Sequence, residues 1–185
     1  MSRIVLACAC ATAVSWGVAS AETIIVDPSA FADGADISNA VDHVTLSTAQ
    51  GSMVIEFLDV IEPLELTSDL TTPVFAVGGV FAHSAGDIWS AGQCCGGDQV
   101  LRADFERPTF SVAVHFLPND TDTGVLQIYD GRGRLLAEQL ARDNVPFTIS
   151  VDTPNKPIAY ALATYGDTGR IATLSFDMPP RPGVE

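Results

Sequence analysis

Oxygen-bearing side chains gather in the stretch Asn119-Asp120-Thr121-Asp122-Thr123-Gly124. Calcium is bound by six to eight oxygen atoms, and carboxylates and side-chain amides are typical donors. Asn119, Asp120 and Asp122 are therefore the candidate metal ligands, and calcium is the candidate cofactor. The stretch departs from an EF-hand loop, because it lacks the downstream acidic residue that binds through both oxygens. The same residue types also build turns between strands, so a plain turn is the alternative.

A tryptophan lies in a glycine-rich stretch, 78–98, that shows no periodicity. Irregular stretches of this length tend to be functional. An aromatic ring on a loop can stack on the face of a sugar, with polar neighbours beside it. Trp89, with His83 and Asp87, is therefore the candidate glycan-binding group. The alternative is that Trp89 anchors the loop against the core.

Two adjacent cysteines, Cys94 and Cys95, follow in the same stretch. An exported protein meets oxidising conditions, in which free thiols rarely persist. Adjacent α-carbons are closer together than a disulfide prefers, so a bond between these two would distort the backbone. The neighbouring Gly96 and Gly97 tolerate such distortion. We hypothesise a vicinal disulfide, with a pair of buried reduced thiols as the alternative.

Recognisable catalytic patterns are missing from the sequence. The histidines His43, His83 and His115 lack the spacing of a metal-binding pair, and no Gly-x-Ser-x-Gly motif occurs. Two carboxylates for glycoside hydrolysis could still meet in space, so a polysaccharide hydrolase or lyase is a distant alternative. A second acidic group would form only if the first and last strands were neighbours: Asp27, Asp33, Asp36 and Asp177.

The middle of the chain predicts the elements that position these residues. Apolar residues alternate with small or polar ones over Phe110–Phe116, a period of two that places one face of a strand in a core and His115 on the other. A polar loop leads to a second apolar run, Val125–Tyr129. The turn Asp130–Gly133 then starts a return strand at Leu135. The pattern predicts three consecutive antiparallel strands.

Further short runs of strand-forming residues are separated by Gly, Pro, Asn and Asp. They are Thr23–Val26, Val41–Ser47, Met53–Leu58, Val74–Val77, Phe147–Val151, Ile158–Leu162 and Ile171–Phe176. Many short strands at regular spacing predict an all-β fold, and we expect a single antiparallel β-sandwich of jelly-roll type over residues 22–178. Residues 179–185 hold three prolines and are expected to form a disordered tail.

The first 21 residues predict an export signal. Arg3 is followed by the apolar run Ile4–Val18 and by Ala19-Ser20-Ala21, a small-x-small site of the kind that signal peptidase cleaves. The apolar run is too short to span a membrane. We therefore expect cleavage before Glu22, no membrane-spanning segment in the mature chain, and a secreted or periplasmic location.

The mature chain would be strongly acidic. It would keep 23 acidic and eight basic residues, and Lys156 would be its only lysine. Nucleic acids and anionic membranes are bound by clustered basic residues, so neither is an expected partner. The acidity suits solubility in salty surroundings or the binding of cations.

One segment, Phe31–Gly51, resembles the opening of exported bacterial β-sandwich proteins of the PEP-CTERM (choice-of-anchor) kind, in which Gly, Ile or Leu, Asn and Val-Thr-Leu-Ser follow one another. Phe105–Pro108 and the alternating run after it are similar to the central strands of those proteins. Ile171–Phe176 is placed like their last strand. The resemblance implies a β-sandwich in an extracellular setting, and it implies no catalytic residues.

This chain departs from that family pattern in two ways. The sorting tail with Pro-Glu-Pro, a membrane helix and a basic end is not in this sequence. Ala172-Thr173 stands where the last strand often carries an acidic residue, which weakens a calcium site of the kind found in related jelly-roll carbohydrate-binding modules.

Together these features favour a secreted, non-catalytic module that binds an extracellular glycan, calcium or both at or outside the cell surface. The alternative is a structural extracellular matrix protein. That alternative predicts exposed edge strands or flat self-complementary faces. The sequence does not determine an oligomeric state.

Overall fold

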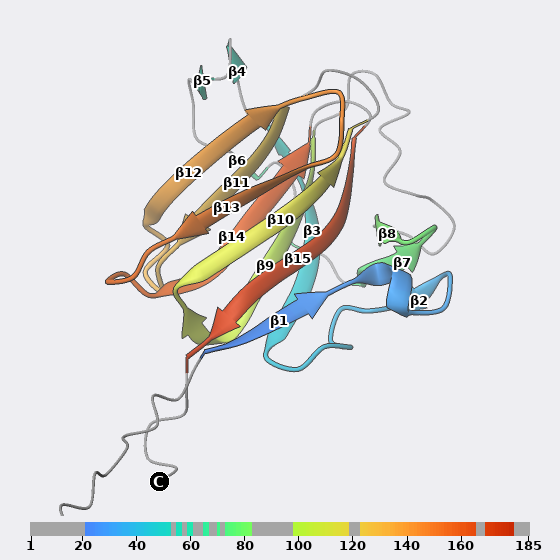
Figure 1. Cartoon of the computed structure of the whole chain (residues 1–185), viewed down its shortest axis with the longest axis horizontal. Helices are drawn as coiled ribbons and strands as arrows, with labels where there is room; N and C mark the ends of the chain where they lie inside the picture. Colours follow the sequence, from blue (N-terminus) through green and yellow to red (C-terminus); the bar gives the residue numbers. More distant parts are fainter. Residues whose placement is uncertain are drawn as a thin grey trace, which may run out of the picture.

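The structure, a computed structural model, describes residues 21–52, 55–56, 59–60, 65–66, 70, 73–82, 98–118, 123–165 and 169–179. Two antiparallel sheets pack face to face around one core (Figure 1). This arrangement confirms the predicted all-β sandwich, and the jelly-roll subtype stays a prediction. Within the described ranges, no helix is long and apolar enough to cross a membrane.

One sheet has four strands. In spatial order they are β1 (Glu22–Val26), β15 (Arg170–Met178), β10 (Ser111–Leu117) and β13 (Phe147–Asp152). All neighbouring pairs in this sheet are antiparallel. The earliest described strand therefore lies beside the last one, as Figure 1 shows for the blue β1 and the red β15.

The second sheet has six strands. In spatial order they are β12 (Leu135–Arg142), β11 (Thr123–Tyr129), β14 (Ile158–Tyr165), β9 (Asp98–Thr109), β3 (Val44–Ser52) and β6 (Glu65–Leu66). Smaller elements accompany the sandwich: the 3-10 helix η1 (Pro28–Ala30), the sheet of β2 (Ala35–Asp36), β7 (Phe75–Val77) and β8 (Val80–Ala82), and the pair β4 (Ile55–Glu56) and β5 (Asp59–Val60).

The prediction of three consecutive antiparallel strands is wrong in its pairing. Strand β10 belongs to the four-stranded sheet, whereas β11 and β12 form a hairpin in the other sheet. The chain returns to the first sheet at β13, which pairs with β10. Apolar residues of β10 and β11 share one core because the strands belong to the two sheets that face each other. A common inward direction does not show whether two strands lie in the same sheet or in opposite sheets.

The core contains the alternating residues that the sequence predicts. Val112, Val114 and Phe116 of β10 are buried in one cluster with Leu126 and Ile128 of β11. Phe110, predicted to join them, is 36% exposed instead. It lies between the end of β9 and the start of β10, outside both ladders, so the alternation does not extend to it.

Strand β9 is not predicted by the sequence pattern, and Pro108 near its end is unusual for a strand that has neighbours on both sides. The pairing with β3 ends at Phe105, and the pairing with β14 is interrupted between Asp104 and Thr109. Proline has no N–H to donate, so it is tolerated where the ladder is already broken.

The stretch 78–98, expected to be irregular, begins with a hairpin. Gly78 and Gly79 connect β7 and β8 with φ of 58° and 76°. Two positive φ values are required by the tight type I′ turn, and glycine adopts them without strain. The other predicted strands are present with shifted bounds, except that only residues 55–56 of Met53–Leu58 are described as strand.

Candidate functional site

The candidate site residues of the sequence lie outside the described residues. They are His83, Asp87 and Trp89 for a glycan, Asn119, Asp120 and Asp122 for calcium, and Cys94 and Cys95 for the vicinal disulfide. These three assignments stay predictions.

The first and last strands are neighbours, because β1 pairs with β15, but their register does not gather the second acidic group. Asp177 lies opposite Thr23 near the start of β1, and Asp27 follows the other end of that strand. Each carboxylate of the group has a partner of its own. Asp177 accepts a 2.7 Å hydrogen bond from Thr23, and the other three accept from backbone N–H groups: Asp27 from Ser29, Asp33 from Gly78 and Asp36 from Ser38. Among the described residues, no group of three or more His, Cys, Asp or Glu side chains could hold a metal ion.

Functional groups gather instead on the outer face of the six-stranded sheet. The strand register places Tyr129 beside Tyr160, Tyr160 beside Asp104, and Asp104 beside Thr45 in one row. The next row contains Arg102, Leu162 and Gln127, followed by Glu138 on β12. We call this surface the tyrosine face, and it comprises Arg102, Asp104, Gln127, Tyr129, Glu138 and Tyr160.

The ring of Tyr160 is covered on both sides. The ring of Tyr129 stacks on it with centroids 4.7 Å apart and an interplanar angle of 6°. The guanidinium carbon of Arg102 lies 4.0 Å from its centroid. Arg102 is held there by Asp104, which accepts hydrogen bonds from Nε at 2.7 Å and Nη2 at 2.6 Å. The bidentate pair, the cation–π contact and the stacked rings form one continuous column across three strands.

A buried amide fixes the other end of the column. Gln127 is fully buried, and its Oε1 accepts a 2.7 Å hydrogen bond from the hydroxyl of Tyr129. Its Nε2 donates a 2.5 Å hydrogen bond to Glu138 on the neighbouring strand. The acceptor and the donor of the Gln127 amide are therefore both used, and Tyr129 is held in one orientation.

The column keeps its phenols neutral. Burial, assisted by Tyr160 and Glu138, raises the pKa of Tyr129 to about 12. Burial also raises the pKa of Tyr160, although the positive charge of Arg102 opposes that shift. The hydrogen bond to Asp104 raises the pKa of Arg102. Near neutral pH the face thus presents hydroxyl groups, one guanidinium and carboxylates.

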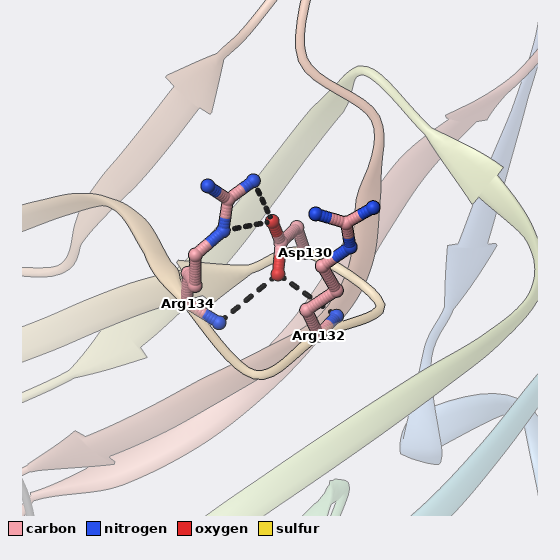
Figure 2. Close-up of polar contacts among 3 residues, drawn as sticks. All are labelled: Asp130, Arg132 and Arg134. Carbon is pink, nitrogen blue, oxygen red and sulfur yellow. Dashed lines mark hydrogen bonds and ion pairs between the residues drawn. The ribbon is translucent and has the colours of Figure 1, made fainter.

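The turn between β11 and β12 borders this face. Figure 2 shows the contacts of Asp130 within the turn. Asp130 accepts hydrogen bonds from the backbone N–H groups of Arg132 at 2.9 Å and Arg134 at 3.0 Å, and from the Arg134 side chain. The Arg134 N–H, with the guanidinium and the Arg132 N–H, lowers the pKa of Asp130 despite its desolvation. A Cβ at Gly133, whose φ is 74°, would lie 3.7 Å from the Tyr160 hydroxyl, so the turn sits close to the tyrosines.

One signal in the sequence pointed to this face. Arg102 and Asp104 are two residues apart, a spacing that puts both on one side of a strand. The tyrosines come from runs on distant strands, and their meeting depends on a strand order that no local pattern encodes.

Comparison with known proteins gives little guidance. No family model matches the chain, and no curated protein sequence matches it. Among solved structures, the enzymatically active domain of tailspike protein 4 of bacteriophage CBA120 is similar at a TM-score of 0.33 and 10% sequence identity. The match covers 80% of this chain and 20% of that chain. A TM-score this low carries no argument about function.

Proposed function

We propose that this chain is a secreted, non-catalytic β-sandwich module that binds an extracellular glycan at the tyrosine face. The observation that carries the proposal is the continuous column Asp104–Arg102–Tyr160–Tyr129, fixed at its far end by Gln127. The predicted export signal and the resemblance to exported β-sandwich proteins support the extracellular setting.

The chemistry of the face suits a ligand rich in hydroxyl groups. The carboxylate side chain of Asp104 is 41% exposed and keeps acceptor capacity on both oxygens, while the Tyr160 hydroxyl both donates and accepts. Leu135 follows Tyr129 in the same row and is 43% exposed, which adds an apolar contact. Both faces of the Tyr160 ring are covered, so the residue presents its ring edge and its hydroxyl to a ligand. Binding therefore relies on hydrogen bonds more than on stacking.

The fixed geometry favours binding for a second reason. Every side chain in the column already has the partner that orients it, so little rotamer freedom is lost when a ligand arrives. A face ordered in advance gains affinity by lowering this entropic cost.

A glycan-array screen of the mature protein, with and without calcium, tests the proposal. For a glycan that binds, Asp104→Asn should weaken binding by about tenfold or more, the loss expected for a charge-assisted hydrogen bond, and Tyr160→Ala should weaken it through the loss of a neutral hydrogen bond. His115→Ala on the outer face of the other sheet is the control and should leave binding unchanged. Equal binding by all three variants would overturn the assignment to this face.

Further variants locate the ligand if the tyrosine face fails. Trp89→Ala, together with His83→Ala and Asp87→Ala, tests the glycine-rich stretch. Asp122→Ala tests whether a calcium ion held with Asn119 and Asp120 supports binding or raises the melting temperature by mass action.

For the cysteines, intact mass under non-reducing conditions should show a monomer two mass units lighter than the reduced form if Cys94 and Cys95 are bonded.

A specific observation also supports the structural alternative. Strand β1 is at the edge of its sheet, and Ile25 on it is 60% exposed. An exposed edge with an apolar side chain is a template for pairing with another chain. If the protein assembles through this edge, sedimentation should show concentration-dependent oligomers, and Ile25→Lys should restore monomers. A monomer at all concentrations would contradict this alternative.

A further inference from the structure

A pocket separate from the tyrosine face lies between η1 and the β7–β8 hairpin. Its volume is about 350 Å³, near the lower end for sites that bind small groups. Phe31 gives it an apolar wall, Ser29 and Asp33 give it polar groups, and Gly78 and Gly79 complete the opposite side. Figure 1 shows η1 and this hairpin side by side, beyond the end of β1.

Hydrogen bonds hold the two sides of the pocket together. Asp33 accepts a 2.7 Å hydrogen bond from the N–H of Gly78 through Oδ1. The N–H of Gly34 donates to the carbonyl of Ala76 at 2.7 Å. Asp27 caps η1 by accepting from the N–H of Ser29 at 2.8 Å. The pocket is therefore already formed in the absence of a ligand.

The glycine turn keeps the pocket open. A Cβ at Gly79 would lie 3.5 Å from the Cβ of Ser29 on the opposite wall, so any larger side chain there would extend into the gap. The turn needs positive φ at both glycines, and this requirement also leaves that side without side chains.

The half of the mature chain that supplies every lining residue of the pocket is acidic. Residues 22–101 contain 12 Asp and Glu and no Lys or Arg, and all eight basic residues of the mature chain come from Arg102 onward. A field of one sign raises the local concentration of groups of the opposite sign. Asp33 is exposed at the pocket and provides a negative charge within it.

We propose that this pocket receives a lysine side chain of a basic partner protein. The aliphatic stem would lie along Phe31, and the ammonium would bind the Oδ2 atom of Asp33. Oδ1 already accepts the N–H of Gly78, so Oδ2 is the oxygen left with its full acceptor capacity for a ligand. A single point charge on a flexible stem fits the remaining oxygen better.

Amide chemical shifts of the mature, isotope-labelled protein test this proposal. The probes are Nα-acetyl-lysine methylamide and its uncharged analogue Nα-acetyl-norleucine methylamide. The lysine probe should shift Ser29, Gly78 and Gly79 saturably, and the norleucine probe should not. Asp33→Asn should raise the Kd by about tenfold or more. Asp152→Asn, an exposed residue on β13 with the same charge change, is the control and should leave it within twofold.

Several outcomes would overturn the proposal. Equal binding of norleucine would show an apolar pocket without charge recognition. Equal weakening by Asp152→Asn would show only the overall field. Tighter binding of n-butylamine than of the lysine probe would point to a small free amine. Self-association lost in Lys156→Gln would identify a second copy of this chain as the occupant. Melting curves of the variants ensure that each is folded before its binding is compared.

Discussion

Strands β10 and β11 are adjacent in the chain and equally apolar on their inner sides, yet their outer sides differ. In β10, buried Val112, Val114 and Phe116 alternate with partly exposed residues such as Ala113 and His115. In β11 all seven residues are buried. Both strands have neighbours on each side within their sheets, so their position in the sheet does not account for the difference.

The outer side chains account for it. Beside β10, the outer residues are small or polar, as in the pairs Ala113 with Ser150 and His115 with Thr148, and those of β10 stay partly exposed. Beside β11, Gln127 and Tyr129 extend over their neighbours and pack against each other and Tyr160. The alternation of β10 indicates one buried face, whereas the uninterrupted run of β11 indicates two. We place the ligand beside this packed surface, at the exposed carboxylate of Asp104 and the hydroxyl of Tyr160.

The largest effect is expected on the inner side that the two strands share. Ile128→Ala should lower the free energy of unfolding by about 2–5 kcal/mol, because it removes buried contacts and leaves a cavity between the sheets. Urea denaturation followed by far-UV circular dichroism measures this loss. A loss below about 1 kcal/mol would mean that the inner faces do not meet as tightly as the structure describes.

The outer side of β11 should also respond strongly. Gln127→Ala leaves the Tyr129 hydroxyl and Glu138 without their buried partner and should cost about 1–3 kcal/mol of unfolding free energy. Gln139→Ala, at an exposed position of β12, is the matched control and should stay within about 0.5 kcal/mol. If the two variants are equally stable, the outer face of β11 is not a packed surface.

Alkaline titration sharpens the comparison further. The pKa of Tyr129 is raised from 10.0 to about 12, so its phenol stays neutral in the folded protein where the unfolded chain ionises. Its contribution to stability is full below pH 10 and is lost as the pH rises toward 12, at up to about 1.4 kcal/mol per pH unit. Phenolate absorbance should rise latest for Tyr129, and Tyr129→Phe should remove that last phase. A single transition near pH 10 for all tyrosines would contradict the buried stack.

The smallest effect is expected on the outer side of β10. His115→Ala removes an exposed contact with Thr148 at 3.0 Å and should change the free energy of unfolding by less than about 0.5 kcal/mol. Urea denaturation of His115→Ala, run in parallel with that of Gln127→Ala, measures this change. A loss as large as that of Gln127→Ala would erase the distinction between the two outer faces.

The fold class could be read from local pattern, because alternation over Val112–Phe116 and the turn at Asp130–Gly133 are both short-range signals. Pairing could not be read in this way. A residue that points into a sandwich core does so equally well from either sheet, and nothing in Leu126 or Ile128 tells which. The candidate site depended on this missing information, since Tyr129 and Tyr160 become neighbours only through the order of β11 and β14.

The pairing of β1 with β15 has a consequence for how the protein forms. Among the described strands, β1 has β15 as its only partner, and β15 also separates β1 from β10. Strand β1 is synthesised before the other described strands, and it cannot pair until β15 has been made. The paired residues Glu22 and Met178 are more than a hundred residues apart. Contacts of such long range close large loops before they add stability, and they make folding slow. The four-stranded sheet can therefore gain its edge strand β1 only after β15 has been synthesised.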